Sequence, residues 1–200
     1  MKNNLLKSVV YTGNSIKEII PALAKLRIEV FYEFPYLYEG SLAYEENYLS
    51  MYVESGSSVC VALFEGDTLV GASTGLKMTD AEEEFQEPFL RRGFNLDEVF
   101  YFGESVLSKR YRGQGYGKLF FKQREAHARR LEGITTCTFC AVERDTSHPA
   151  RPQSYRELGS FWQAMGYAQQ TDIYTHYAWT DVGHEKETSK KMVFWLKNVQ

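Results

Sequence analysis

The sequence has little cysteine, since its 200 residues include only Cys60, Cys137 and Cys140. An odd and low count argues against a disulfide framework. Cys137 and Cys140 form a C-x-x-C pair in an apolar run, but residues three apart on a strand face opposite sides of a sheet, and no second pair completes a zinc site. His176 and His184 have no companions at ligand spacing. We therefore expect buried, reduced thiols and no bound metal.

Long apolar runs and clustered positive charge are lacking as well. The opening residues Met1-Lys2-Asn3-Asn4 lack the apolar core of a signal peptide, and no run approaches the length of a membrane span. The formal net charge is -3, and no dense basic stripe suggests contact with nucleic acid. We expect a cytoplasmic protein that binds neither membranes nor nucleic acid.

Aromatic residues, in contrast, are abundant. The chain has 14 Tyr and 13 Phe, which is more than a core needs, so we expect some rings to line a groove. The hydrophobic share of 44% and the charged share of 24% are ordinary for a soluble globular protein. The length suits one compact core, and we expect a single domain over residues 1–200.

Apolar periodicity and turn signals predict strands at 7–11, 58–64, 68–76, 98–107, 134–142, 173–180 and 191–197, and helices at 21–30, 43–53, 118–131 and 155–165. The polar segment 79–97 is expected to hold a short helix or a mobile insertion. The strand–helix–strand order over 98–142 implies a right-handed parallel crossover inside an otherwise mostly antiparallel sheet, so the fold class is α+β (mixed αβ). The last strand, in which Met192, Phe194 and Leu196 alternate along 191–197, is either an exposed edge that supports a homodimer or a strand buried within the monomer.

The loop between the strand at 98–107 and the helix at 118–131 contains Arg112-Gly113-Gln114-Gly115-Tyr116-Gly117-Lys118. The first N–H groups of a helix are unpaired and lie at the positive end of its dipole, so they bind anions. Alternating glycines let the backbone approach a phosphate, and Arg112 and Lys118 can add positive charge. We interpret this loop as a pyrophosphate site. As a plain tight turn, it would carry the entropic cost of its glycines without a use for them.

Spacing separates this loop from two other phosphate-binding motifs. A Walker loop has four residues between its first glycine and Gly-Lys, followed by Ser or Thr, whereas three residues separate Gly113 from Gly117 and Leu119 follows Lys118. A dinucleotide-binding loop has the spacing G-x-G-x-x-G, whereas the spacing here is G-x-G-x-G. Both motifs fit poorly.

The pattern R-x-x-G-x-G formed by Arg112, Gly115 and Gly117 resembles the acyl-CoA signature of the GNAT superfamily of N-acetyltransferases. The segment 161–167 is similar to a later motif of that family, although Trp162 stands where the family commonly has Tyr. The order of elements also agrees along nearly the whole chain. The resemblance implies a GNAT-like acyl-CoA N-acyltransferase fold, with a central, mostly antiparallel twisted sheet in which the two strands of the parallel crossover splay apart.

The resemblance also implies that acetyl-CoA, as the acyl donor, lies where these two strands separate. Backbone groups near Val106 and Ser108 would pair with its pantetheine arm, and one such amide would polarise the thioester carbonyl. The amides of residues 114–118 would hold the pyrophosphate. The predicted donor-binding residues are Val106, Ser108, Arg112, Gly113, Gln114, Gly115, Tyr116, Gly117 and Lys118.

An amine acceptor arrives largely as an ammonium ion, because an alkylamine has a pKa of about 10, and a base must therefore remove a proton. Glu104 is the candidate base, since several family members carry an acidic residue on this strand. Strand alternation places it on one face with Phe100, Phe102 and Val106. Its alternative role is that of a carboxylate satisfied by the backbone or by an Arg.

Further groups are candidates for proton transfer. Glu143 and Asp145, just past the strand at 134–142, are rivals for the role of base. Tyr155 is a candidate for the acid that reprotonates the departing thiolate, because it lies seven residues before Trp162 on a similar helical face, roughly two turns or about 10 Å away. Because the family's usual Tyr is missing, a reaction without a side-chain acid is the alternative.

The acceptor site of the family is shaped by the first two helices and their linker, which here correspond to residues 31–46. Aromatic rings and carboxylates together suit a cationic amine. In the alternative, the rings pack in the core and the acids are solvated. The predicted acceptor-binding residues are Phe34, Tyr36, Tyr38, Glu39 and Glu143.

The combined prediction is an acyl-CoA-dependent N-acetyltransferase that moves an acetyl group from acetyl-CoA to a primary amine of a small molecule, by direct attack in a ternary complex. A protein lysine or N-terminal acetyltransferase is an alternative, although the bulky aromatic linker favours a covered pocket over an open groove. A non-catalytic CoA-binding regulatory module is the alternative from a different class, favoured by Trp162 and opposed by Glu104.

Overall fold

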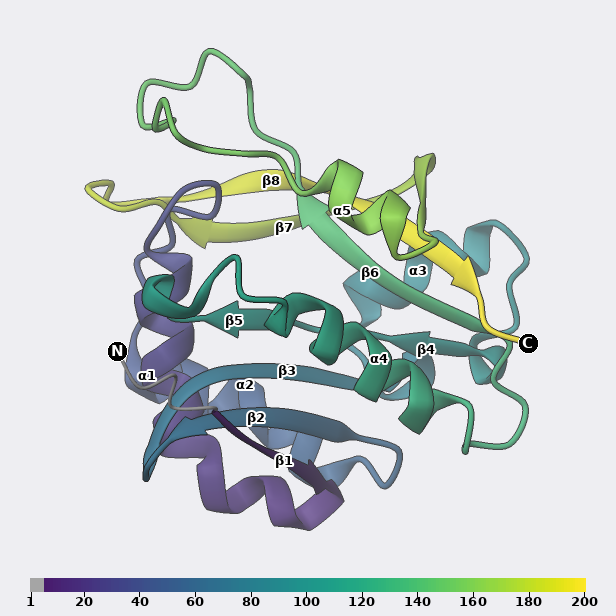
Figure 1. The fold of residues 1–200 in the computed structure, drawn as a ribbon. Helices are drawn as coiled ribbons and strands as arrows, with labels where there is room; N and C mark the ends of the chain where they lie inside the picture. The colour runs from purple at the N-terminus through teal and green to yellow at the C-terminus, as the bar shows by residue number, and fades with distance from the viewer. Residues whose placement is uncertain (1–5) are drawn as a thin grey trace.

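The computed structural model describes residues 6–200. Its centre is a mixed sheet with the strand order β1-β2-β3-β4-β6-β8-β7, and β5 also pairs with β3 (Figure 1). The strands are β1 (Lys7–Thr12), β2 (Val59–Glu65), β3 (Thr68–Lys77), β4 (Val99–Tyr101), β5 (Ser105–Leu107), β6 (Thr136–Val142), β7 (Ala168–Thr180) and β8 (Glu187–Asn198). The β4–β6 pair is parallel and the other pairs are antiparallel. The predicted fold class, with one parallel crossover, is confirmed.

Helices cover both faces of the sheet (Figure 1). The helices are α1 (Ile20–Phe31), α2 (Leu42–Glu54), α3 (Glu83–Arg91), α4 (Tyr116–Ala128) and α5 (Gly159–Ala164), and short 3-10 turns occur at Gly13–Ile19, Met78–Asp80, Leu96–Glu98 and Lys109–Tyr111. One core contains Leu23, Leu49 and Phe85 from α1, α2 and α3, whereas the other contains Phe120 from α4, with Phe161 of α5 packed against it. None of the helices within residues 6–200 is both long and apolar enough to cross a membrane.

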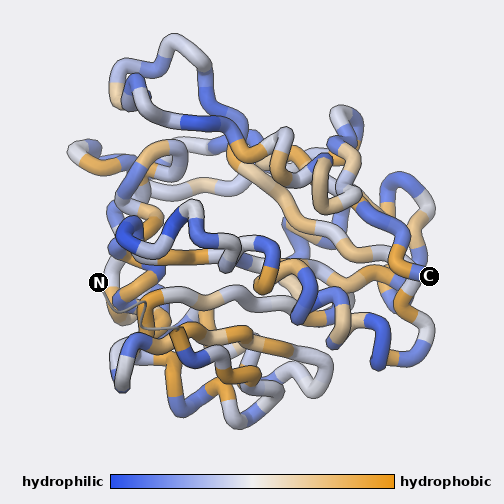
Figure 2. The backbone as a smooth tube through the Cα atoms, viewed as in Figure 1, coloured by the Kyte–Doolittle hydropathy of each residue, from blue (hydrophilic) through white to orange (hydrophobic). Residues whose placement is uncertain are grey.

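Strand β2 is apolar along most of its length (Figure 2), and both of its faces are buried. Val59 and Val61 turn to the α4 side, whereas Cys60 turns to the α1–α2 side, as strand alternation requires. The same alternation places Cys137 and Cys140 in opposite cores. All three cysteines are free and buried, as predicted.

Two ambiguities of the sequence are resolved by the fold. The segment 79–97 contains a helix, because Phe85 and Phe89 of α3 bury their rings against the sheet. The strand predicted at 191–197 belongs to β8, which lies between β6 and β7. This strand is therefore internal to the monomer, and it offers no edge for a homodimer.

The prediction of a helix at 155–165 is wrong for its first part, because α5 begins only at Gly159 and is six residues long. Tyr155 lies in the loop before it, and its N–H donates to the carbonyl oxygen of Pro152 (3.0 Å). Its ring packs edge-on against Phe34, with ring centroids 4.7 Å apart. This contact with the α1–α2 linker holds Tyr155 outside the helix, so it shares no helical face with Trp162.

The strand predicted at 98–107 is broken in the middle. Tyr101 of β4 pairs with Leu76, and Ser105 of β5 pairs with Ser73. Three residues on this strand therefore lie opposite two residues of β3, which defines a β-bulge.

The bulge interrupts the alternation of side chains. Phe100 and Phe102 face the α4 side of the sheet, whereas Val106 faces the α1–α2 side. Glu104 points to the α1–α2 side, where its carboxylate pairs with Arg27 of α1. The prediction that Glu104 shares a face with Phe100 and Phe102 is therefore wrong, because the extra residue reverses the alternation.

The guanidinium of Arg124, a buried residue of α4, holds the bulge. Its Nη1 donates to the carbonyl oxygens of Thr74 and Glu104, both at 3.1 Å, and its Nη2 donates to Ser105 Oγ at 2.8 Å. The guanidinium also lies 4.1 Å from the ring centroid of Phe102. Burial lowers the pKa of Arg124 to about 10, so the side chain is cationic at neutral pH.

We predict that Arg124→Met lowers the free energy of unfolding by about 2–4 kcal/mol, because the bulge carbonyl of Glu104 and the hydroxyl of Ser105 lose their buried donor. Urea denaturation measures this loss. Lys122→Met, at an exposed position of the same helix, should change stability by less than about 0.5 kcal/mol. Equal losses in the two variants would show that Arg124 does not stabilise the bulge.

Candidate active site

The glycine-rich loop before α4 presents a row of free amides. Gly113 and Gly115 have φ angles of +77° and +90°, a left-handed conformation that favours glycine. Within residues 6–200, the N–H groups of residues 113–117 donate to no protein acceptor, and the first bonded amide is that of Lys118, which donates to the carbonyl oxygen of Gly115 (3.0 Å). Free amides at a helix N-terminus form a binding site for an anion such as a phosphate.

The side chains around this loop hold it in place. Arg112 Nε donates to the carbonyl oxygen of Leu107 (2.9 Å), and its Nη1 pairs with Glu33 Oε2 (2.6 Å). Gln114 donates to the carbonyl oxygen of Arg110 (3.0 Å). Arg112 therefore joins the glycine loop both to the end of β5 and to the segment after α1.

The motif around α5 packs against the same loop. A Cβ atom at Gly117 would lie 3.2 Å from the ring of Phe161, so a side chain at this position would press against α5. Trp162 packs instead in the core, with its ring centroid 5.1 Å from those of Phe139 and Trp195. The two segments that carry the family resemblance are therefore in contact.

The parallel strand pair opens next to the glycine loop. Pairing of β4 with β6 ends at Tyr101 and Thr138, and one further bond joins the Phe102 N–H to the carbonyl oxygen of Thr138 (2.7 Å). Beyond this point β5 pairs only with β3, while β6 continues beside β8 as far as Val142. The predicted splay of these two strands is confirmed.

The backbone groups that face this opening differ from those predicted. The Ser108 N–H donates to the carbonyl oxygen of Val70 (2.9 Å), and the Thr74 N–H donates to that of Glu104 (3.0 Å). By alternation, Val106 also directs its backbone groups to β3, and Ser105 and Leu107 direct theirs to the opening. The backbone of Ser105 and Leu107, and not that of Val106 and Ser108, therefore faces the opening.

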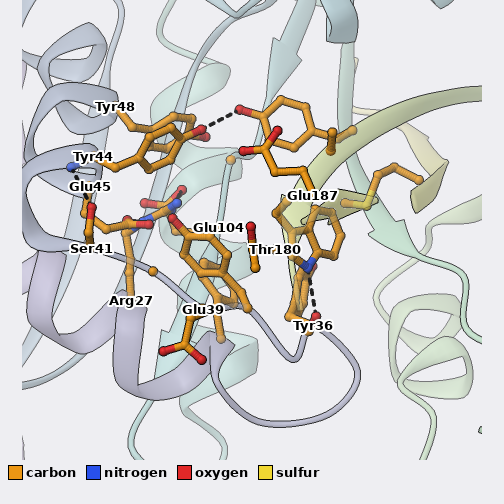
Figure 3. Close-up of a pocket in the computed structure, with 18 of the residues that line it drawn as sticks. Arg27, Tyr36, Glu39, Ser41, Tyr44, Glu45, Tyr48, Glu104, Thr180 and Glu187 are labelled. Atoms are coloured by element: carbon orange, nitrogen blue, oxygen red, sulfur yellow. Dashed lines mark hydrogen bonds and ion pairs between the residues drawn. The ribbon is translucent and has the colours of Figure 1, made fainter. Parts of the chain in front are cut away.

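A cavity of about 430 Å³ lies beside the strand break, lined by α1, α2, their linker and the adjoining ends of β7 and β8 (Figure 3). Nine of its 21 lining residues are aromatic, among them Tyr36, Tyr48, Tyr177 and Trp179. Burial is the largest of the effects that raise the pKa of Tyr36, Tyr48 and Tyr177 above the usual range. These phenols are therefore neutral, and the aromatic walls add no negative charge.

A buried ion cluster lies on the α1–α2 side of the cavity (Figure 3). Arg27 Nη1 pairs with Glu104 Oε2 at 2.7 Å, and Arg27 Nε donates to Glu45 Oε2. The guanidinium carbon lies 4.5 Å from the ring centroid of Tyr48. Burial alone would lower the pKa of Arg27, but the neighbouring Glu104, Tyr48 and Glu45 raise it well above the usual range.

Each carboxylate of this cluster keeps one oxygen without a partner. Glu45 is fully buried and Glu104 is 5% exposed. Tyr52 donates to Glu104 Oε2 (3.3 Å), but Glu45 Oε1 and Glu104 Oε1 accept no hydrogen bond in the described part of the chain. A buried acceptor without a donor is costly, and both residues line the cavity. Both oxygens are buried, so the two carboxylates add negative charge beside the cavity without exposing these oxygens on its surface.

Arg144, which follows β6, fixes the α1–α2 linker that lines one side of the cavity. Its Nε donates to the carbonyl oxygen of Pro35 (2.8 Å), and its Nη2 donates to that of Tyr36 (2.7 Å). Its two terminal nitrogens also pair with Asp181, at 3.1 and 2.8 Å. Trp179 Nε1 donates to the same Tyr36 oxygen (2.9 Å). The linker between α1 and α2 is thereby held against the end of β7.

Comparisons with known proteins agree with this geometry. The model of the acetyltransferase (GNAT) family matches residues 23–159 of the sequence. This chain belongs to the GNAT acetyltransferase family. The resemblance inferred from the sequence motifs is thereby confirmed. A search of curated proteins found no significant match.

Solved structures share the GNAT fold at low sequence identity. An aminoglycoside 6'-N-acetyltransferase complexed with coenzyme A has 15% identity and a TM-score of 0.58, covering 96% of this chain and 97% of its own. The yncA acetyltransferase of Salmonella typhimurium with acetyl-CoA has 10% identity and a TM-score of 0.56, covering 97% and 95%. Arabidopsis thaliana NAA60 in complex with a bisubstrate analogue has 11% identity and a TM-score of 0.59, covering 97% and 100%.

The GNAT fold brings some of the predicted acceptor residues together and separates others. Tyr36, Tyr38 and Glu39 line the cavity. Phe34 lies outside its lining, packed against Tyr155. Glu143 also lies outside the lining, where its carboxylate pairs with a lysine of β8 at 2.9 Å.

The candidates for proton transfer are likewise separated. Of these, only Glu104 lines the cavity, whereas Tyr155 does not. Asp145 is fully exposed, and hydrogen bonds from the side chain and N–H of Ser147 lower the pKa of its carboxyl group. Among residues 6–200, no group of three or more His, Cys, Asp or Glu side chains is arranged to hold a metal ion.

Sequence reasoning about this GNAT domain missed Arg27 and Arg144. Arg27 is a charged residue on the apolar face of α1, four positions after the buried Leu23, and this placement is the signal that could have revealed it. Arg144 has no such signal, because its partners lie on two distant segments. Glu45 is one of several acids within residues 31–46, and nothing local marks it as the buried one.

We predict that Gly115→Ala weakens CoA binding about tenfold, because a Cβ atom at φ +90° costs about 1–2 kcal/mol of backbone strain at the loop that would hold the pyrophosphate. Isothermal titration calorimetry with CoA measures the change. Gly56→Ala is the matched control, since a Cβ atom meets open space at both positions and Gly56 has an ordinary φ. Unchanged CoA binding by Gly115→Ala would remove the left-handed loop from the donor site.

Proposed function

We propose that this GNAT acetyltransferase moves an acetyl group from acetyl-CoA to a primary amine of a small molecule, by direct attack in a ternary complex. The observation that carries the proposal is the position of Glu104, a buried carboxylate at the strand break that lines a cavity together with Glu39 and Glu45. One side of the opening offers free amides for the donor, and the other side offers carboxylates for a cation. The fold is shared with an aminoglycoside 6'-N-acetyltransferase, which agrees with a small amine acceptor.

On the donor side, the amides of residues 113–117 would bind the pyrophosphate of acetyl-CoA. Its pantetheine arm would run along the open edge of β5, beside Ser105 and Leu107. A backbone amide at this edge would donate to the thioester oxygen and stabilise the negative charge that develops there. The side chain of Arg112 would add positive charge next to the phosphates, and Lys118, exposed on the first turn of α4, would add more.

On the acceptor side, Glu104 Oε1 would take one proton from the ammonium group, because Oε2 is occupied by Arg27 and Oε1 is free. The neutral amine then attacks the thioester carbon, so a C–N bond forms and the C–S bond breaks. The attacking nitrogen loses a second proton, which goes to the departing thiolate. The products are the N-acetylated amine and CoA thiol, and one proton passes from Glu104 to solvent.

Tyr155 takes part in no step of this reaction scheme. Its ring is packed against Phe34 outside the cavity, and burial is the first of the effects that raise the pKa of its hydroxyl. Transfer of the second proton between nitrogen and sulfur needs no side-chain acid. This agrees with the presence of Trp162 at the position where the family commonly has Tyr.

The two alternative functions are less well supported. A peptide acceptor needs an open groove, whereas the linker that Arg144 fixes brings Tyr36, Tyr38 and Glu39 into the lining of this cavity. A CoA-binding module without catalysis has no use for a buried carboxylate with a free oxygen, which costs stability. The cavity therefore favours a small acceptor and a catalytic role for Glu104.

We predict that Glu104→Gln lowers kcat about 100-fold or more, because general base catalysis contributes at least this much, while the affinity for acetyl-CoA stays near that of the wild type. Thiol release from acetyl-CoA with a panel of primary amines measures kcat, and calorimetry measures donor binding. Glu54→Gln, an exposed carboxylate at the end of α2, is the control and should keep wild-type turnover.

Three results would contradict this assignment. Wild-type turnover by Glu104→Gln would remove Glu104 from the role of base. Loss of turnover in Glu143→Gln in its place would move the role to that rival. Absence of thiol release from the wild type with every amine, despite acetyl-CoA binding, would favour the non-catalytic alternative.

A further inference from the structure

Three side chains from different elements form a continuous chain of hydrogen bonds that starts in the cavity. Tyr44 Oη and Tyr177 Oη lie 3.0 Å apart, and Tyr177 Oη donates to Glu82 Oε2, also at 3.0 Å. Tyr44 belongs to α2 and Tyr177 to β7, and both line the cavity (Figure 3). Glu82 precedes α3 and lies outside the lining. The chain therefore runs from the cavity to a carboxylate outside it.

The carboxylate at the end of this chain fixes its direction. Tyr177 keeps its proton, because its pKa is raised, first of all by burial, and it donates that proton to Glu82. A hydroxyl has only one O–H, so Tyr177 must accept from Tyr44, and Tyr44 is the donor of the pair. Since its own O–H is used in this way, the Tyr44 hydroxyl can offer a further partner only lone pairs.

Helix α3 holds the chain in place. The Tyr177 ring stacks on that of Phe85, with centroids 5.3 Å apart, and Phe85 stacks in turn on Tyr101 of β4 at 5.2 Å. Glu82 is the N-cap residue of α3, but its side chain makes no capping hydrogen bond, so the carboxylate is left for Tyr177. Burial raises the pKa of Glu82, and the hydrogen bond from Tyr177 opposes this rise. The start of α3 thus supplies both groups that fix the Tyr177 hydroxyl.

The end of the chain in the cavity presents surface to a ligand. Tyr44 is 44% exposed, whereas Glu45 and Glu104 are buried. Within residues 6–200, Tyr177 is the only hydrogen-bond partner of Tyr44 Oη. A primary ammonium group has three N–H donors and no acceptor, so it matches a group on the cavity wall that can only accept.

We propose that Tyr44 is an acceptor-binding residue whose hydroxyl accepts a hydrogen bond from an N–H group of the amine, and that Tyr177 and Glu82 are positioning residues that fix the direction of this bond. The inference rests on the proposed function and adds three residues to its site. Because the Tyr44 hydroxyl binds the amine and takes no proton from it, we expect it to lower KM for the amine and to leave kcat nearly unchanged.

The first test is Tyr44→Phe, which removes the hydroxyl alone. We expect KM for the amine to rise about fivefold, the effect of one hydrogen bond, while kcat and KM for acetyl-CoA stay near those of the wild type. Thiol release from acetyl-CoA measures these constants with the best substrate of the primary-amine panel. Tyr174→Phe is the control, because Tyr174 is an exposed tyrosine of β7 outside the cavity lining, and it should keep the wild-type KM.

Charge reversal at Glu82 tests the direction of the chain. In Glu82→Lys, an ammonium that can only donate would reverse the chain, so Tyr44 would direct its O–H at the amine and KM should rise about tenfold. Glu82→Gln, whose amide oxygen can still accept from Tyr177, should restore most of the affinity. Glu83→Lys is the matched control, because Glu83 is exposed in the first turn of the same helix, and it should keep the wild-type KM.

The same reversal in a broken chain separates the hydrogen bonds from charge acting through space. In a Tyr177→Phe background no hydroxyl connects residue 82 to Tyr44, so the addition of Glu82→Lys should change KM for the amine by less than about twofold. A tenfold rise that persists in this background would overturn the positioning role of Tyr177 and Glu82.

The remaining outcomes separate this inference from the function on which it rests. A wild-type KM for the amine in Tyr44→Phe would overturn the binding role of Tyr44 while leaving amine acetylation in place. A loss of kcat in that variant with KM unchanged would also overturn it, because the hydroxyl would then act in the reaction step. Acetylation of no amine by the wild type would overturn the proposed function and this inference with it.

Discussion

The geometry of the site depends on one extra residue between Tyr101 and Ser105, which has no counterpart on β3. Because of this residue, pairing with β6 stops near Phe102 and β5 turns away with β3 alone. The same residue reverses the alternation of side chains, so Glu104 points to α1. A regular strand would close the opening and place Glu104 among the rings on the α4 side. The opening proposed for the donor and the orientation of Glu104 therefore both result from the bulge.

Two buried arginines stabilise the two sides of this bulge in different ways. Arg124 binds carbonyl and hydroxyl oxygens, and with no carboxylate among these partners its burial lowers its pKa to about 10. Arg27 binds two carboxylates, and its pKa is raised despite burial. Arg124 therefore contacts only neutral acceptors, whereas Arg27 is shared between two carboxylates.

The sequence predicts best what is encoded by neighbouring residues. The glycine loop is readable because its free amides and left-handed glycines lie within residues 113–117. The bulge is a mismatch between two strands, so the alternation of a single strand cannot reveal it. Its one local trace is Gly103, where a Cβ atom would lie 1.9 Å from Tyr52 Oη. The cluster of Arg27, Glu45 and Glu104 joins three elements far apart in the chain, and its composition follows only from the tertiary fold.

The donor and acceptor sides meet in the linker between α1 and α2. At its start, Glu33 pairs with Arg112 of the glycine loop, and further along, Arg144 binds the carbonyl oxygens of Pro35 and Tyr36. An anion bound at residues 113–117 lies in the field of the same guanidinium that holds Glu33. The segment that carries the rings of the acceptor cavity is therefore tied electrostatically to the loop that would receive the donor, and the two sites of the proposed ternary complex share a wall.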